Sequence, residues 1–176
     1  GCIYRNWARV WPDYHEEGPD RETLIRQGEA ALREAADLAA DPFPYRQVDA
    51  LVNLAWMYYY VDKLDKAEHM LDEVIGKPFL DEYRIKKGEG VPPNWERLPS
   101  FLWTQMGKAE LLRGLIAYKK YQQQEPLVKG GVRDEALLAE VAEHFTLTLA
   151  YTELFAPGSD HRGLRGAKNT MYTALQ

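Results

Sequence analysis

The sequence predicts an all-α protein of antiparallel helix pairs, with about six or seven helices. Apolar and small residues recur at spacings of three and four along most of the chain, as in Leu24, Gly28, Ala31 and Leu32. No segment shows a convincing alternation of apolar and polar residues between turn formers, so we expect no strands. The chain has 176 residues, of which 45% are hydrophobic, which suffices for a single domain with a real core.

Capping residues and turn formers mark where the helices begin and end. The expected helices cover about 20–40, 44–61, 64–76, 101–122 and 135–155, and a final one runs from about Arg162. Asp20, Ser100 and Asp134 are expected to cap their helices, and Pro44 suits a first helical turn. The final segment, from His161 to Lys168, is locally basic.

The helix expected over 44–61 is apolar on two sides. One stripe, which we expect to pack inward, consists of Leu51, Leu54, Ala55, Tyr58 and Val61. The other consists of Val52, Trp56, Tyr59 and Tyr60. A helix with two apolar stripes is either fully buried or lies between a core and a groove. The second stripe can therefore line a groove, or pack under a loop or against a neighbouring helix.

A long irregular connection is expected over residues 77–99, which are rich in proline and glycine. Connections of this length are often functional or disordered, and Tyr83 and Trp95 are candidate anchors. A small-ligand site or active site beneath this loop is one hypothesis, with Tyr83, Trp95 and His69 as its first candidates.

Residues 48–81 resemble one tetratricopeptide repeat, a helix pair of about 34 residues. The positions that carry the resemblance are Leu51, Asn53, Leu54, Ala55, Tyr58, Leu64, Ala67, Leu71 and Val74. A small residue such as Ala67 lets the two helices approach closely. Asp62 stands where the family usually has a turn glycine, and the other helix pairs match by architecture only. The resemblance implies a single TPR-like domain over 1–176, and a generic helical bundle is the alternative.

The resemblance also implies a non-enzymatic scaffold that binds a protein or peptide, as a regulatory or sensor part of a larger protein. The positions that this family uses for ligands correspond to Asp49, Val52, Trp56, Tyr59 and Tyr60. Val52 and Trp56 occupy two places where a carboxylate clamp has polar or basic residues. An aromatic groove at these places suits an apolar or helical peptide instead.

Composition argues against several other classes of protein. The formal net charge is −5, which does not favour a general binder of nucleic acid or of anionic membranes. No apolar run is long enough to span a membrane. The four histidines, His15, His69, His144 and His161, lie on different segments, and we predict neither a metal nor a cofactor. No nucleophile elbow or phosphate-binding loop is present.

The first residues pose a separate question. Gly1 and Cys2 resemble the cleavage site of a bacterial lipoprotein, although no leader precedes them. We expect the chain to be a fragment of a longer cytoplasmic protein, and an envelope scaffold anchored by a lipid on Cys2 is the alternative. Four aromatic residues then share one helical face and are expected to form a lid on the first helix pair or, alternatively, a ligand site: Tyr4, Trp7, Trp11 and Tyr14.

Overall fold

The computed structural model describes residues 20–41, 43–86, 88–124 and 135–155, and this part of the chain contains helices and no strands. The α-helices are α2 (Arg21–Ala39), α3 (Pro44–Tyr60), α4 (Leu64–Ile75), α5 (Ser100–Gln123) and α6 (Glu135–Phe155). Two short 3-10 helices, η2 (Pro78–Tyr83) and η3 (Trp95–Arg97), lie between α4 and α5. The all-α prediction is therefore confirmed for the described residues. The chain forms two compact units, which divide between Leu80 and Asp81.

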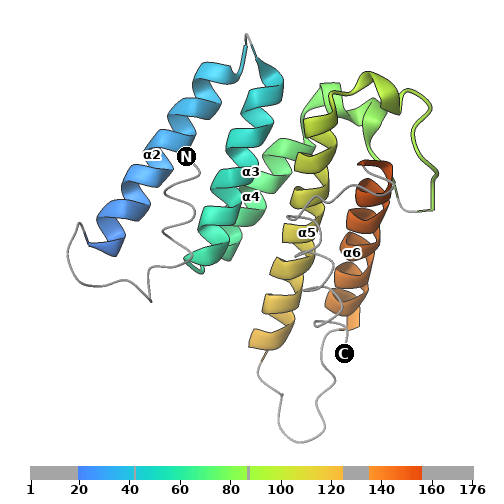
Figure 1. Cartoon of the computed structure of the whole chain (residues 1–176). Coiled ribbons are helices and arrows are strands. Elements are labelled where there is room, and N and C mark those ends of the chain that lie inside the picture. Colours follow the sequence, from blue (N-terminus) through green and yellow to red (C-terminus); the bar gives the residue numbers. More distant parts are fainter. Residues whose placement is uncertain (1–19, 42, 87, 125–134, 156–176) are drawn as a thin grey trace, which may run out of the picture. The chain divides into compact units, whose positions relative to one another are not determined.

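In the first unit, α2, α3 and α4 follow one another in antiparallel order, and α3 packs against both of the others (Figure 1). The residues that carry the tetratricopeptide resemblance form its core. Leu51, Leu54, Ala55 and Ala67 have no exposed surface, and Tyr58 is 1% exposed. Complete burial of so small a residue as Ala67 fits a close crossing of α3 and α4.

The ends of these helices follow the local sequence. Asp20 caps α2, because its carboxylate accepts hydrogen bonds from the backbone N–H of Thr23 at 2.9 Å and from the Thr23 hydroxyl at 2.7 Å. These two bonds lower the pKa of Asp20. Pro44 begins α3, as its fixed φ favours.

The turn from α3 to α4 is formed by Asp62, which has a φ of +63°. The backbone N–H groups of Asp62 and Lys63 donate to the carbonyls of Tyr59 and Tyr58, at 3.2 and 2.9 Å. This pair of bonds is the Schellman motif, whose left-handed position normally takes glycine. Asp62 therefore adopts the left-handed conformation that glycine usually takes at this position of the motif.

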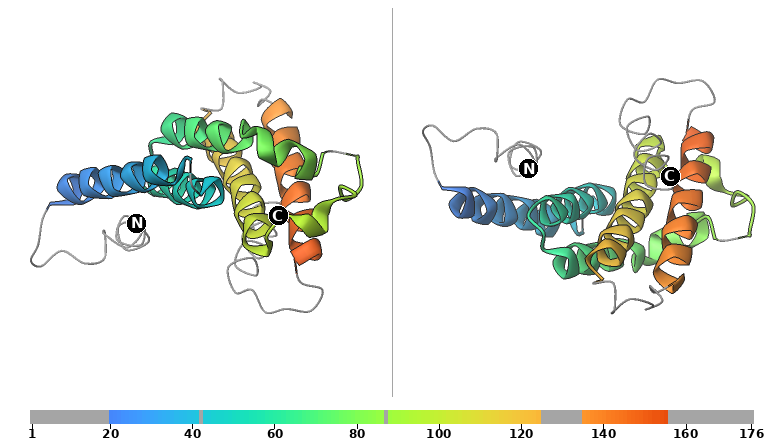
Figure 2. Two further views of the ribbon diagram at one scale, coloured as in Figure 1. Left: turned by 90° about the horizontal axis from the view of Figure 1, so that it is seen from above. Right: turned by 90° about the horizontal axis from the view of Figure 1, so that it is seen from below.

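In the second unit, α5 and α6 run side by side and antiparallel in every view (Figures 1 and 2). Phe145 on α6 is 1% exposed, and Gly114 on α5 lies directly against it. A Cβ atom at Gly114 would lie 2.5 Å from the Phe145 ring, so glycine is required where the helices meet.

The connection before α5 is anchored by two hydrogen bonds within the second unit. The backbone N–H of Ile85 donates to the Tyr151 hydroxyl at 3.0 Å, and the Trp103 indole donates to the Trp95 carbonyl at 3.2 Å. The bond at Trp95 uses its backbone carbonyl, and the Trp95 ring also lies against the Trp103 ring, with centroids 6.5 Å apart. The predicted cap of α5 is wrong, because Ser100 is its first helical residue and Pro99 occupies the capping position without a side-chain hydrogen bond.

Several predictions concern residues outside the described part of the chain. These are the aromatic residues of 4–17, the thiol of Cys2, the cap at Asp134 and the helix from Arg162. Among the described helices, none is both long and apolar enough to cross a membrane.

Candidate functional site

Three large rings meet at the end of α3. Trp56, Tyr59 and Tyr60 contact one another, with ring centroids 5.7 to 5.9 Å apart. Two of the three pairs are edge-to-face, which is a favourable geometry for aromatic rings. All three side chains are half-buried, so each keeps part of its surface accessible. We call these residues the aromatic cluster.

The surroundings of the aromatic cluster are partly desolvated. Burial raises the pKa of the Tyr59 phenol, and the nearby Tyr60 and Asp62 raise it further. Tyr59 therefore stays a neutral hydroxyl near neutral pH, which can donate or accept a hydrogen bond. The arrangement offers apolar ring surface together with polar hydroxyls, a combination common at protein interfaces.

The other two predicted contacts occupy different environments. Val52 is 1% exposed, so it belongs to the core and does not line an accessible surface. Asp49 is half-buried, and both its carbonyl and its carboxylate accept from the Asn53 amide, at 2.8 and 3.2 Å. The structure therefore brings together three of the five predicted residues.

A polar network ties α3 to both neighbours in the first unit. The Tyr58 hydroxyl on α3 bonds to Glu29 on α2, and this hydrogen bond is the main reason that the pKa of Glu29 is lowered. Lys66 on α4 lies 3.6 Å from the Glu29 carboxylate and 5.3 Å from the centre of the Tyr58 ring. Tyr58, which belongs to this network, lies two positions before Tyr60. The network therefore stabilises the end of α3 that carries the aromatic cluster.

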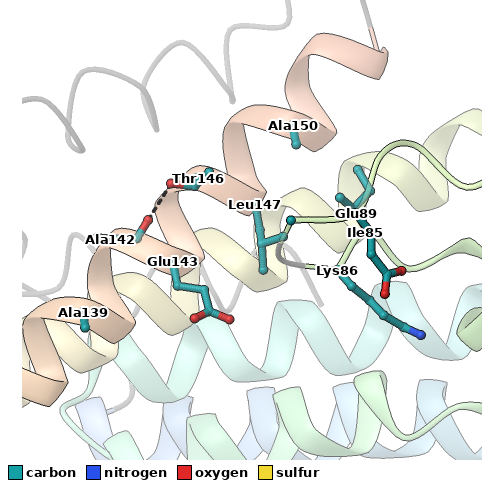
Figure 3. A pocket seen from close by; sticks show the side chains of 10 residues that line it. Ile85, Lys86, Glu89, Ala139, Ala142, Glu143, Thr146, Leu147 and Ala150 are labelled. Carbon is teal, nitrogen blue, oxygen red and sulfur yellow. Dashed lines mark hydrogen bonds between the residues drawn. The ribbon is translucent and has the colours of Figure 1, made fainter.

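A separate hollow of about 410 Å³ lies in the second unit (Figure 3). One wall is α6, and the other consists of Ile85, Lys86, Gly88 and Glu89. The α6 wall consists of Ala139, Ala142, Glu143, Thr146, Leu147 and Ala150. Tyr83, Trp95 and His69, the predicted candidates for a ligand site, are not among the lining residues. Trp95 lines a second hollow, with Trp103 and residues 96–100.

A buried ionisable pair joins α5 and α6. His144 Nδ1 is 2.7 Å from Glu110 Oε2, and His144 Nε2 is 3.6 Å from Glu140 Oε1. Nothing in the local sequence signals this pair, because the partners are 34 residues apart. Among the described residues, no three His, Cys, Asp or Glu side chains form a group that could hold a metal ion.

No protein-family model, curated protein or solved structure matches the chain.

Proposed function

We propose that this chain is a TPR-like interaction module that binds a protein or peptide partner through the aromatic cluster. The observation that carries the proposal is the accessibility of Trp56, Tyr59 and Tyr60 beside a fully buried stripe on the same helix. Aromatic side chains of this kind supply most of the binding energy at many interfaces, since they bury large areas and lose little rotamer freedom.

The packing of the first unit supports the proposal. Leu51, Ala55 and Ala67 are buried where the tetratricopeptide resemblance requires them to be. Their burial also fits a generic helical hairpin, so the family assignment remains part of the proposal. In either case, α3 packs between α2 and α4. The helix that carries the aromatic cluster is therefore already ordered, which limits the conformational entropy lost when a partner binds.

The chemistry of the cluster favours an apolar or helical peptide. The described α3 carries one cation, Arg46, near its beginning, and the cluster itself contains none. A clamp for a terminal carboxylate needs cationic and amide donors, which the cluster does not supply. A peptide with large apolar side chains would instead cover the three rings and satisfy the tyrosine hydroxyls at their edge.

The test uses peptides selected from a displayed library against the full chain. Replacing Trp56 by alanine should weaken the selected peptides by about tenfold or more, as expected for a central interface residue. Phe43→Ala is the matched control, because Phe43 is a 63% exposed aromatic residue preceding the same helix and outside the cluster. Circular dichroism should show that both variants keep the helical content of the wild type.

The outcome decides the proposal. If Trp56→Ala binds as tightly as wild type while its fold is native, the aromatic cluster is not the binding surface. If Phe43→Ala weakens binding equally, the surface extends to the other end of α3 and the assignment to the cluster is wrong.

The cytoplasmic location is part of the same proposal, and the lipid-anchored envelope scaffold is its alternative. The two differ in the chemistry of Cys2. Mass spectrometry of the protein isolated from its native cells distinguishes them, because an acylated Cys2 thiol would support the envelope scaffold.

A further inference from the structure

The second unit contains a hollow of about 490 Å³ at the beginning of α5. Its apolar lining consists of Trp95, Leu98, Pro99 and Trp103. A hollow of this size with an aromatic lining is typical of sites that bind small molecules. It shares no lining residue with the hollow on α6. We call it the tryptophan hollow.

The aromatic wall of the tryptophan hollow is held in place by contacts within the second unit. The Trp103 indole donates to the Trp95 carbonyl at 3.2 Å, and the two rings lie edge-to-face. The Trp103 ring also lies against the Tyr151 ring, with centroids 5.7 Å apart, and the Tyr151 hydroxyl accepts a hydrogen bond from the Ile85 N–H. Trp103 is 3% exposed, so the half-buried Trp95 supplies the accessible ring surface. A wall formed in advance limits the conformational entropy lost when a ligand binds.

Two side chains of opposite charge, Glu96 and Arg97, also line the tryptophan hollow. Both are exposed, and neither forms an ion pair with another described residue. A ligand in the hollow would remove water from both side chains, which is costly for any charge left without a partner. An anion would pair with Arg97 but face Glu96, and a cation would pair with Glu96 but face Arg97. A ligand that carries both charges satisfies both side chains.

We propose that the tryptophan hollow binds a free amino acid with an apolar or aromatic side chain. The carboxylate of the ligand pairs with Arg97, its ammonium group pairs with Glu96, and its side chain packs on the Trp95 ring. Arginine binds carboxylates with two parallel hydrogen bonds, and an ammonium group above an indole ring gains cation–π attraction. This site lies in the second unit and does not involve the aromatic cluster, so either proposal can fail without the other.

Titration of the full chain with four related compounds tests the proposal, with the indole N–H signals followed by NMR. Phenylalanine carries both charges, phenylpropionate carries only the carboxylate, phenethylamine carries only the ammonium group, and the amide of N-acetyl-phenylalanine carries neither. We expect phenylalanine to bind at least about fivefold more tightly than each of the other three compounds. The reason is that only phenylalanine pairs with both charged side chains, which remain partly exposed to water.

Two variants that each remove one charge separate the two pairings. Arg97→Gln should weaken the binding of phenylalanine and phenylpropionate about fivefold, but not that of phenethylamine. Glu96→Gln should weaken the binding of phenylalanine and phenethylamine, but not that of phenylpropionate. Lys86→Gln and Glu89→Gln are the matched controls, because both residues are exposed and charged, belong to the second unit and do not line the tryptophan hollow. Neither control should change any affinity.

A third variant tests the aromatic wall. Trp95→Leu removes the accessible ring and keeps the backbone carbonyl that accepts from Trp103. It should weaken the binding of phenylalanine by about five- to tenfold, since the ligand loses an aromatic contact and apolar area. Circular dichroism should show that this variant keeps the helical content of the wild type.

Three results would overturn the proposal. The absence of any saturable indole shift at high millimolar phenylalanine would show that the tryptophan hollow takes no free amino acid. Equal affinities for phenylalanine and for the uncharged amide would show that Glu96 and Arg97 do not recognise the ligand. Losses of affinity in Lys86→Gln or Glu89→Gln as large as those in Arg97→Gln would place the binding site elsewhere.

Discussion

At the scale of single residues, Asp62 determines how α3 turns into α4. Its φ of +63° is costly for any residue with a Cβ atom and is tolerated best by glycine, asparagine and aspartate. The motif that it completes ends α3 directly after the aromatic cluster. The backbone geometry of Asp62 therefore influences where α3 ends relative to the aromatic cluster.

We expect Asp62→Gly to raise the free energy of unfolding by roughly 0.5 kcal/mol, because glycine relieves the left-handed strain. Asp62→Ala should lower it by about 1 kcal/mol, since alanine keeps the Cβ and loses the local bonding of the aspartate. Urea unfolding of the wild type and the two Asp62 variants measures the order of their free energies of unfolding. An alanine variant as stable as the glycine variant would contradict the proposed strain.

Tyr58 and Glu29 make stability depend on pH. The folded pKa of Glu29 is below its ordinary value of 4.5, mainly because the Tyr58 hydroxyl bonds to its carboxylate. The unfolded chain therefore binds this proton more readily than the folded chain. The stabilisation of the folded state by the Glu29 carboxylate is complete at pH values above the ordinary pKa of Glu29. It is lost as the pH falls through the lower pKa that Glu29 has in the folded chain.

Tyr58→Phe should accordingly cost about 1 kcal/mol at neutral pH, as expected for one hydrogen bond to a charged group. The difference from wild type should shrink as the pH falls below about 4.5. Tyr45→Phe is the control, because it removes a hydroxyl from a 40% exposed tyrosine on the same helix. Denaturant unfolding across this pH range makes the measurement, and a pH-independent difference would exclude the Glu29 linkage.

At the scale of helices, the packing of α5 on α6 depends on Gly114. A methyl group there would lie 2.5 and 2.6 Å from two carbons of the Phe145 ring and 3.3 Å from the Cβ of His144. Phe145 is 1% exposed and has little room to move away. The steric conflict therefore opposes the higher helix propensity of alanine.

We expect Gly114→Ala to lower the free energy of unfolding by about 1–2 kcal/mol, since overpacking costs more than the gain in propensity. Gly90→Ala should be nearly neutral, because nothing lies within 4 Å of a Cβ there. Adding Phe145→Leu to Gly114→Ala should recover part of the loss, because it removes the ring. Thermal unfolding compares these proteins, and an unchanged Gly114→Ala variant would refute the close contact.

At the scale of the whole molecule, the charge distribution limits the choice of partner. The chain has 22 basic and 27 acidic residues, for a net charge of −5. Phosphate contacts supply most of the non-specific affinity for nucleic acid, and they require a basic surface. The acidic net charge therefore does not favour a general nucleic-acid partner.

We predict no measurable binding of the full chain to duplex DNA at about 0.15 M salt. Fluorescence anisotropy with a labelled duplex tests this expectation. The salt dependence is the control, since any binding that decreases steeply between low and moderate salt would indicate phosphate contacts and contradict the prediction. The same titration with a peptide selected on the aromatic cluster should be much less sensitive to salt.

The sequence by itself determined the helices and most of their ends. Helical periodicity and caps such as Asp20 act within a few residues of the chain, so α2, α3, α4, α5 and α6 begin and end close to their predicted limits. The sequence also identified the aromatic residues of α3. Ser100 was mispredicted as a cap, because Pro99 takes the capping position in the folded chain.

Only the tertiary structure decided which of these residues are accessible and which distant residues meet. Val52 and Trp56 are one helical turn apart and equally apolar in sequence, yet one is 1% exposed and the other half-buried. Glu110 and His144 are 34 residues apart, and Ile85 and Tyr151 are 66 apart. Such contacts depend on how the helices pack against one another. The fit of side-chain volumes across a helix interface produces no periodic pattern in the sequence of either helix, so the sequence alone does not predict these contacts.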